Sequence, residues 1–321
     1  MLKILVVMPV LEHHKKLLEQ TAPEASFEYC LAKDLTAEQV AGADIIIGNA
    51  PARLIQGTSR LKWLQLNSAG TDGYTTPGVL PESALLTNAS GAYGLAISEH
   101  MIASLLYLMK KLNCYSADQR THTWSDHGQV TSIYGARTLV VGLGDIGGEF
   151  AQRMHALGST VTGIRRTAAD KPEYLEALYQ MDHLKECLAE ADIVASSLPG
   201  TRATYKLFNA EAFACMKQGA YFLNVGRGTA VDSLALADAL NSGHLAGAAV
   251  DVTDPEPLPA DHPLWEAKNL LITPHISGNY HLQETHERII RIAARNLARY
   301  LKGEPLENMV DFTTGYRVPK Q

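Results

Sequence analysis

The sequence predicts an α/β protein of two domains, each built on a doubly wound, Rossmann-like parallel sheet. The chain has 321 residues, more than one hydrophobic core usually organises. Short apolar runs alternate with helical stretches along most of it, and at residues 138–148 a glycine-rich turn joins a strand directly to a helix. Such alternation forms a parallel sheet covered by helices on both faces, whose ligands bind at the carboxyl ends of the strands.

The first domain is expected at residues 1–96, together with the C-terminal segment 284–321. Its strands are predicted at residues 3–7, 27–30, 45–48, 63–66 and 85–88. Thr36 and Gln39 form a capping box for one of the intervening helices. The turn NSAGTDG at residues 67–73 follows the fourth strand, and its backbone amides could hold a carboxylate. An ordinary turn explains the same residues equally well.

The second domain is expected at residues 97–283, after a hinge of small residues at 88–95. It opens with a helix at residues 97–112, for which Ser98 is the expected N-cap. Apolar residues wrap more than one face of this helix, which favours a subunit contact, although packing within one chain gives the same pattern. Further strands are predicted at residues 160–164, 192–197, 221–225, 247–252 and 270–273, and further helices at 210–216 and 233–241. A final helix near residues 283–301 is expected to return to the first domain.

The motif GLGDIG follows the strand at residues 138–141 and predicts a dinucleotide site. Gly142 permits the tight turn, Gly144 lets the backbone approach a pyrophosphate, and Gly147 lets the helix pack close to the strand. With Asp145 and Ile146 between them, these residues present amides at the positive end of a helix dipole.

Two arginines predict which dinucleotide is bound. An NAD site usually carries an acidic residue at the end of the next strand, whereas an arginine there accommodates a 2′-phosphate. Here that strand ends in Arg165 and Arg166, about twenty residues beyond the glycines. We therefore predict NADPH in preference to NADH, with a solvated arginine pair as the alternative interpretation.

Composition argues against several classes of function. The formal net charge of −6 gives no basic footprint for nucleic acid. The four cysteines form neither a CxxC pair nor a metal-ligand spacing, so we expect buried thiols in a reducing cytoplasm and no metal site. No stretch approaches the roughly 18 apolar residues of a membrane span, and the apolar run at residues 1–10 is too short for a signal sequence. A cytoplasmic protein without nucleic-acid or membrane partners is expected.

Three charged or titratable residues each follow a strand of the second domain. They are Arg227 in NVGRG, Glu256 in DPEP and His275 in TPHISG. Each alone is explained by structure, as an exposed arginine, a turn glutamate or a hydrogen-bonded loop histidine. Because parallel strands end at one edge of the sheet, together they supply what the reduction of a carbonyl requires.

Six motifs in this order resemble those of the D-isomer-specific 2-hydroxyacid dehydrogenase family: GLGDIG, SSLPGT, NVGRG, VDVTDPEPLP, HPLW and ITPHISG. The resemblance covers nearly the whole chain. It implies a first domain that binds substrate, a second that binds the cofactor, a cleft between them, and a homodimer formed through the cofactor domain. It also implies hydride transfer between NAD(P)H and a small 2-oxo acid such as glyoxylate or hydroxypyruvate.

The resemblance and the chemistry assign roles to these residues. Arg227 would grip the substrate carboxylate and polarise the carbonyl, since a guanidinium presents paired donors. His275, beside the nicotinamide, would protonate the carbonyl oxygen, and Glu256 would orient the imidazole and favour its protonated form.

By the same resemblance, further loops contact the ligands. The amides of Ser68, Ala69 and Gly70 match a carboxylate-binding loop, although Ser68 stands where many members have glycine. The family's commoner acidic residue is replaced by the arginine pair. The cofactor would also meet later loops, at Leu198, Pro199, Thr201, Val225 and Asp251.

Other activities are weighed against this one. A dinucleotide-sensing scaffold like the C-terminal-binding corepressors shares the fold and can retain the same three residues, so turnover of 2-oxo acids separates it from an enzyme. Formate dehydrogenases pair their histidine with glutamine, which Glu256 disfavours. A phosphoglycerate-type enzyme with a regulatory module is disfavoured because the chain ends soon after its last helix.

Overall fold

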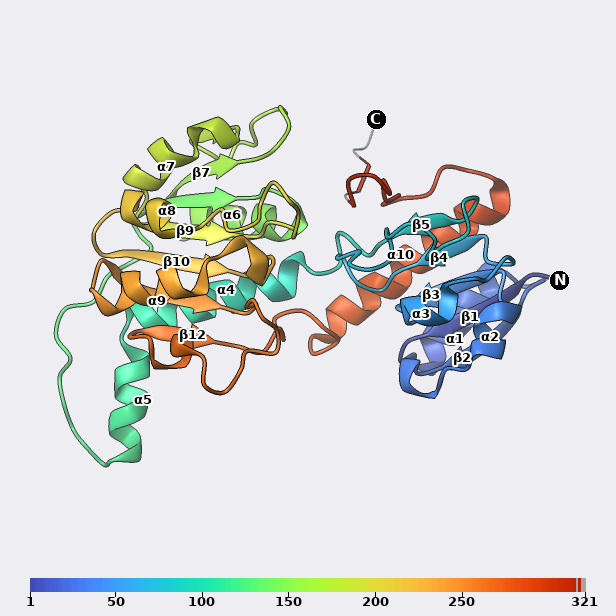
Figure 1. Cartoon of the computed structure of the whole chain (residues 1–321), viewed down its shortest axis with the longest axis horizontal. Coiled ribbons are helices and arrows are strands. Elements are labelled where there is room, and N and C mark those ends of the chain that lie inside the picture. The colour runs from blue at the N-terminus through green and yellow to red at the C-terminus, as the bar shows by residue number, and fades with distance from the viewer. Residues whose placement is uncertain (316, 319–321) are drawn as a thin grey trace. The chain divides into compact units, whose positions relative to one another are not determined.

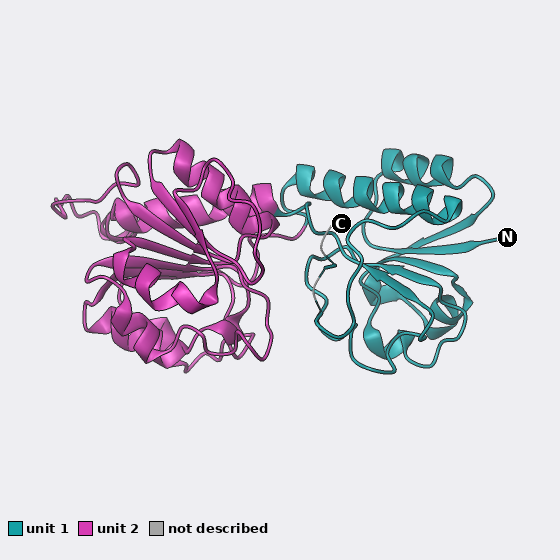
Figure 2. Cartoon of the chain, turned by 90° about the horizontal axis from the view of Figure 1, so that it is seen from above, with its two compact units in different colours: residues 1–93, 280–321 teal, residues 94–279 magenta. Residues whose placement is uncertain are grey.

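The computed structural model describes residues 1–315, 317 and 318, and it divides the chain into two compact units (Figure 2). Unit 1 comprises Met1–Tyr93 and Tyr280–Gln321, and unit 2 comprises Gly94–Asn279. The chain therefore passes between the units twice, at 93/94 and at 279/280, whereas the sequence predicts boundaries at 96/97 and 283/284.

Unit 1 is a five-stranded parallel sheet in the order β2-β1-β3-β4-β5 (Figure 1). Helices α1 and α10 pack together on one face, and α2 and α3 pack together on the other. The inner strands β1 and β3 are buried, largely apolar runs because both faces of the sheet are covered. The elements are β1 (Lys3–Val7), α1 (Glu12–Thr21), β2 (Ser26–Cys30), η1 (Ala32–Asp34), α2 (Ala37–Gly42), β3 (Ile45–Gly48), α3 (Ala52–Ile55), β4 (Trp63–Gln65), β5 (Leu85–Thr87) and α10 (Gln283–Lys302).

Helix α10 joins the C-terminal segment to the sheet of unit 1. It ends at Gly303, whose φ of 69° closes the helix in the left-handed conformation. Its Tyr300 stacks on Trp63 at 5.4 Å between ring centroids. Buried Asn296 donates to Gln65 Oε1 at 2.8 Å and accepts from the N–H of Glu307 at 2.7 Å. These contacts join α10 to β4, so that residues far apart in the sequence form one core.

Unit 2 is a seven-stranded parallel sheet in the order β12-β11-β10-β9-β6-β7-β8. Its order reverses between β6 and β9, the position at which doubly wound sheets bind ligands. The elements are α4 (Gly94–Met109), α5 (Leu112–Arg120), β6 (Arg137–Val141), α6 (Asp145–Ala156), β7 (Thr160–Ile164), β8 (Ala177–Tyr179), η2 (Met181–His183), α7 (Leu184–Glu190), β9 (Ile193–Ser196), α8 (Ala210–Cys215), β10 (Ala220–Asn224), η3 (Gly228–Ala230), α9 (Ser233–Asn241), β11 (Leu245–Val250), η4 (Pro263–Glu266) and β12 (Leu270–Ile272).

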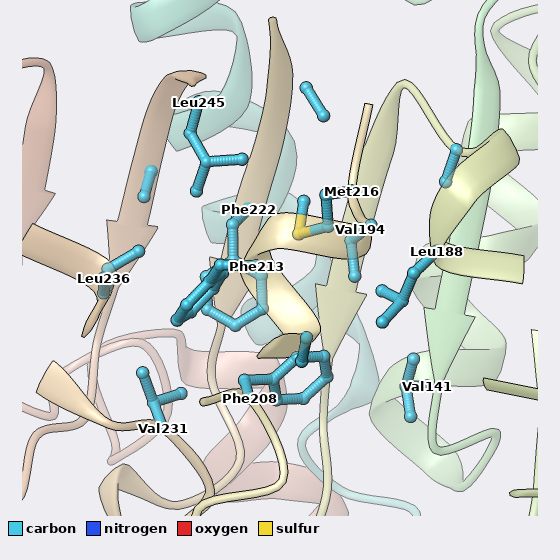
Figure 3. Packing of buried hydrophobic residues seen from close by; sticks show 14 of the residues in the cluster. Val141, Leu188, Val194, Phe208, Phe213, Met216, Phe222, Val231, Leu236 and Leu245 are labelled. Atoms are coloured by element: carbon cyan, nitrogen blue, oxygen red, sulfur yellow. The ribbon is translucent and has the colours of Figure 1, made fainter. Parts of the chain in front are cut away.

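The core of unit 2 lies between its sheet and the layer of α7, α8 and α9 (Figure 3). Phe222 of β10 is central to it, with ring centroids 4.9 Å from Phe208 and 5.3 Å from Phe213. On the opposite face α4 packs against α6 and β11. The apolar residues that wrap α4 are therefore buried in part by packing within the chain.

The structure confirms the predicted fold class, and every predicted strand lies within two residues of an observed one. The capping box at Thr36 and Gln39 is also confirmed, because each backbone N–H donates to the other side chain, at 2.8 and 3.3 Å. The prediction of Ser98 as an N-cap is wrong. Helix α4 begins at Gly94, and buried Ser98 Oγ donates to Leu95 O at 3.0 Å inside its first turns.

Two further points differ from the sequence expectations. The expected helix at 97–112 is interrupted at Lys111, which has a φ of 56°, and a second helix, α5, follows. The four cysteines are free and partly exposed rather than buried. Among the residues that the structure describes, no helix is long and apolar enough to span a bilayer.

Candidate active site

The turn between β6 and α6 has the features that a pyrophosphate requires. Gly142 has a φ of 99°, a conformation that favours glycine. A Cβ on Gly147 would overlap the carbonyl oxygen of Gly142, so the helix can start this close to the strand only with glycine there. At Gly144 the space that a side chain would take is open.

The backbone donors of this turn are left for a ligand. The N–H groups of Gly144, Asp145, Ile146 and Gly147 donate to no acceptor among the described residues. They surround the N-terminus of α6, a 12-residue helix, where the helix dipole is positive. An anion fits such a site, so the residues present fit a dinucleotide.

The carboxylate of Asp145 serves another helix. Its Oδ2 accepts from the N–H of Gly94 at 2.9 Å, which caps the start of α4. A Cβ on Gly94 would stand 2.6 Å from Glu149 Cγ and 2.8 Å from Asp145 Oδ1, so the two helices meet too closely for any side chain there. Asp145 can therefore meet a cofactor through its amide, while its carboxylate holds α4.

The arginine pair lies on the strand next to the glycine turn. β7 pairs with β6, with Val141 opposite Ile164, and Arg165 follows at once. The N–H of Arg165 donates to Tyr179 O of the edge strand β8 at 3.1 Å. Arg166 is exposed. This is the strand end at which a 2′-phosphate is read in dinucleotide sites.

The loop after β9 carries three of the expected cofactor residues. Leu198 is buried, and Thr204 Oγ1 ties the loop together by donating to Pro199 O at 2.7 Å and accepting from the N–H of Thr201 at 2.9 Å. Val225, after β10, donates its N–H to Ser196 O of β9 at 3.1 Å. All four residues therefore lie at the carboxyl edge, beside the switch point of the sheet.

Arg227 lies in a turn that a buried asparagine holds. Asn224 ends β10, and its side chain donates to Arg227 O at 3.1 Å and accepts from the N–H of Gly226 at 3.2 Å. Arg227 Nη1 donates to Gly226 O at 2.9 Å. A Cβ on Gly200 would stand 3.2 Å from Arg227 Cγ, so the stem of the arginine lies over the loop that follows β9.

Glycines bring the neighbouring loops into contact. A Cβ on Gly226 would overlap the backbone of Leu198, and one on Gly228 would overlap the carbonyl of Thr253. Thr253 directly precedes the DPEP segment that carries Glu256. The loops after β9, β10 and β11 therefore touch one another, with Arg227 among them.

The structure brings Glu256 and His275 together. His275 Nδ1 and Glu256 Oε1 are 2.5 Å apart, with the side chains 47% and 41% exposed. His275 has a φ of 53°, and its N–H donates to Asp251 O at 2.8 Å. Because Nδ1 faces a carboxylate, it carries a proton, and Nε2 is left to exchange a proton with a ligand.

Asp251 organises the loop on which His275 lies. Its carboxylate is buried and accepts four hydrogen bonds, from Thr273 Oγ1 (2.5 Å), Ile276 N (3.0 Å), Ser277 N (3.0 Å) and Ser277 Oγ (2.5 Å). Thr273 Oγ1 lies 3.2 Å from His100 Nε2 of α4, which is the donor in that pair. The sequence pointed to Asp251 as a cofactor contact, and the structure gives it a positioning role as well.

In unit 1, the NSAG loop follows β4 at the carboxyl edge of the sheet. The carbonyls of Asn67, Ser68, Ala69 and Gly70 all accept hydrogen bonds from their own unit, those of Ser68 and Ala69 from Ala89 N (2.9 Å) and Asn88 Nδ2 (2.7 Å). The N–H groups of residues 68–70 donate to no acceptor among the described residues. Hydrogen bonds to its carbonyls thus hold the loop, and its amides are left available to bind an anion.

One cluster of potential metal ligands lies elsewhere in unit 1. Nε2 of His13 and of His14 stand 2.8 and 3.0 Å from Glu287 Oε1. His14 Nδ1 accepts from the N–H of Leu11 at 3.2 Å, so in the neutral ring the proton is on Nε2, the atom that an ion would need. Burial lowers the pKa of His14 despite the hydrogen bond to Glu287. The cluster is therefore a hydrogen-bonded contact between α1 and α10.

Sequence reasoning missed the polar residues that hold these loops. Their common signal is a small polar residue at a strand end or within five residues after it, which on sequence alone is indistinguishable from an ordinary loop residue. They are Asn49, Asn67, Asn88, Asn224, Thr273 and Ser277.

The sequence and the fold are similar to those of known proteins. The sequence model of the D-isomer specific 2-hydroxyacid dehydrogenase NAD-binding domain matches residues 102–277, which lie within unit 2. A glyoxylate reductase of Thermofilum pendens is 32% identical over 79% of this chain and 76% of its own length.

Solved structures extend the likeness to the whole fold. A D-isomer specific 2-hydroxyacid dehydrogenase family protein of Aeromonas salmonicida superposes with a TM-score of 0.87 at 32% identity, covering 97% of this chain and 99% of the other. A D-isomer specific 2-hydroxyacid dehydrogenase of Xanthobacter autotrophicus, solved with NADPH and MES, gives 0.82 at 28% identity, covering 98% and 99%.

Proposed function

The chain belongs to the D-isomer specific 2-hydroxyacid dehydrogenase family, and we propose that it reduces small 2-oxo acids, such as glyoxylate or hydroxypyruvate, with NADPH. The observation that carries the proposal is the hydrogen bond between His275 Nδ1 and Glu256 Oε1. It leaves Nε2 for proton exchange. His275 follows β12 at the carboxyl edge of the sheet, where the loop of Arg227 also meets the loop that leads to Glu256.

The proposed reaction divides the work among three side chains. A bound dinucleotide supplies the hydride. Arg227 binds the oxo-acid carboxylate and polarises the carbonyl with its paired donors. His275 holds a proton on Nε2 for the carbonyl oxygen, and Glu256 keeps the ring in orientation and stabilises the imidazolium. The amides of residues 68–70 are proposed as further donors to the carboxylate.

The test of the acid is His275→Ala. Loss of general acid catalysis should lower kcat for glyoxylate reduction by a factor on the order of 10² to 10⁴. The matched control is His183→Ala, because His183 Nδ1 forms a similar exposed pair with Glu186 at 3.1 Å, outside the loops that carry Arg227, Glu256 and His275. A loss under tenfold, or an equal loss in the control, disqualifies His275.

The preference for NADPH rests on Arg165 and Arg166 at the end of β7. Arg165→Asp replaces a donor to the 2′-phosphate with a repelling charge, so the ratio of kcat/KM for NADPH over NADH should fall on the order of 100-fold. Arg137→Asp is the control, since Arg137 begins the neighbouring strand β6 at its opposite end. A wild-type preference for NADH, or an unchanged ratio in Arg165→Asp, removes the proposal.

A panel of 2-oxo acids, assayed with both cofactors, identifies the substrate. It also separates the enzyme from a dinucleotide-sensing scaffold, which would bind NADPH without turnover. Glyoxylate and hydroxypyruvate should be reduced most efficiently, and turnover of none of the panel would favour the scaffold.

We infer that the protein is a homodimer. Helix α5 and the loop after it extend from the sheet of unit 2 (Figure 1) and expose large apolar side chains, among them Trp124, whose side chain is fully exposed. Sedimentation should give twice the chain mass. A monomer in sedimentation that is fully active contradicts the inference.

A further inference from the structure

The two places where the chain passes between the units share one feature. On the unit 1 side, each carries a tyrosine directly at the crossing, Tyr93 at 93/94 and Tyr280 at 279/280. Both phenols bond to the same residue. The hydroxyl of Tyr93 donates to Asn67 O, and Asn67 Nδ2 donates to the oxygen of Tyr280.

Asn67 is the first residue of the NSAG loop. Its own N–H donates to Asn49 Oδ1 at 3.0 Å, and Asn49 Nδ2 in turn donates to Ser68 Oγ at 3.0 Å. Asn67 Oδ1 is buried and has no hydrogen-bond partner among the described residues. Tyr280 is therefore the partner that holds its side chain, and the removal of one hydroxyl would leave this amide without any.

The same crossings are held on the unit 2 side by two carboxylates. The N–H of Gly94 donates to Asp145 in the dinucleotide turn at 2.9 Å. Ser277, two residues before the second crossing, donates its N–H and its hydroxyl to Asp251, which also holds the loop of His275. On the unit 1 side, the chain at each crossing is thus bonded to the NSAG loop. On the unit 2 side, the first crossing is bonded to the dinucleotide turn through Asp145, and the second is bonded to Asp251, which holds the His275 loop.

Both tyrosines keep their protons over the working pH range of such an enzyme. Burial raises the pKa of Tyr280 to about 12, although the hydrogen bond from Asn67 lowers it. Burial, with a smaller contribution from Tyr280, also raises the pKa of Tyr93. The hydrogen bonds are therefore made by neutral hydroxyls, so a role in positioning should not depend on pH.

We propose that Tyr93 and Tyr280 are positioning residues that act through Asn67 to hold the amides of residues 68–70 for the substrate carboxylate. The proposal rests on the proposed function of that loop. Neither tyrosine is assigned a contact with cofactor or with the reacting atoms, so each should influence the affinity for the oxo acid and leave the proton-transfer step unchanged.

The test uses the full chain with Tyr93→Phe and Tyr280→Phe, which remove one hydroxyl and retain the ring. The KM for glyoxylate should rise about 5- to 15-fold in each. kcat, its pH profile and the Kd of NADPH should stay within about twofold, a split that a general loss of stability would not produce. The control is Tyr29→Phe, because Tyr29 makes a comparable hydrogen bond to Glu19, between β2 and α1, at 3.1 Å.

Hydrogen exchange of the peptide that contains residues 66–72 gives a readout without turnover. In both variants the amides of this peptide should exchange at least about fivefold faster than in the wild type, because a hydrogen bond that anchors Asn67 is lost. In Tyr29→Phe the exchange rate should not change. If the wild type reduces no oxo acid but exchange accelerates, the proposed function fails and the positioning role stands. If KM and exchange both match the control, the positioning role is overturned, and so it is if kcat or the Kd of NADPH changes while KM does not.

Discussion

Replacing the buried carboxylate of Asp251 with an amide tests the account of the His275 loop. In Asp251→Asn one carboxylate oxygen becomes an NH₂ group. Each oxygen now accepts from one hydroxyl, of Thr273 or Ser277, and from one backbone N–H, of Ile276 or Ser277. Whichever way the amide is oriented, the hydroxyl beside the new NH₂ group can rotate to accept a hydrogen bond from it. The backbone N–H on the same side cannot, so it is left facing the NH₂ group, which is also a donor.

The magnitude follows from these bonds. A buried donor left without an acceptor costs about 1 to 3 kcal/mol. The two bonds that remain lose the assistance of the charge, which is roughly 1 kcal/mol for each. Together we expect a loss of about 3 to 5 kcal/mol, concentrated in the loop at residues 273–278, which corresponds to at least about a 100-fold increase in local opening.

Hydrogen exchange of this loop is the direct assay, with the thermal midpoint and kcat as companions. Asp182→Asn is the matched control in the same unit, because Asp182 is exposed and its nearest basic partner, His183, is 4.0 Å away. The control should change exchange and the thermal midpoint little. If Asp251→Asn exchanges residues 273–278 as slowly as the control, the carboxylate does not hold the loop and the reasoning fails.

Other predictions follow from single contacts. Gly147→Ala places a Cβ on the Gly142 carbonyl and should weaken NADPH binding by on the order of tenfold or more in a fluorescence titration, whereas Gly148→Ala, whose Cβ would meet only a tyrosine hydroxyl at 3.6 Å, should not; equal affinities refute the turn. Burial would raise the pKa of Asp44. Hydrogen bonds from the side chains of Arg60 and Lys62 and from the backbone N–H of Lys3 instead lower it from 3.8 to about 2. The carboxylate therefore stabilises the fold above pH 4, by about 2 kcal/mol, and this is lost as the pH falls to 2. Urea unfolding of Asp44→Asn should differ from the wild type at pH 7 and converge with it near pH 2, and a gap independent of pH contradicts the assignment. Asn296→Ala removes one of two hydrogen bonds to the buried Gln65 Oε1, which keeps the bond from the Thr87 hydroxyl, and it removes the acceptor of the Glu307 N–H. We expect a loss of about 2 kcal/mol in urea unfolding; a loss under about 0.5 kcal/mol speaks against that network.

Local patterns were enough to predict the strands, because a parallel sheet covered on both faces needs continuous apolar runs such as β3. They were also enough to predict the glycine turn, since the need for a positive φ at Gly142 and for close packing at Gly147 arises within a few residues. The edge strand β8 was missed because three residues beside a polar loop show no period. The start of α4 was misplaced because its cap, Asp145, lies 51 residues away in the sequence.

The sequence by itself determined the fold class, the family and the identity of the residues at the strand ends, because each depends on residue types at short spacing. Only the tertiary structure decided what holds those residues: the Asp251 carboxylate under the His275 loop, the Asn224 side chain inside the Arg227 turn, and the two tyrosines on Asn67. Apart from the local bonds of Asn224 to Gly226 and Arg227, these bonds join segments that are brought together by the winding of the chain through parallel sheets. A hydrogen bond depends on distance in space, and spacing along the sequence carries no record of it.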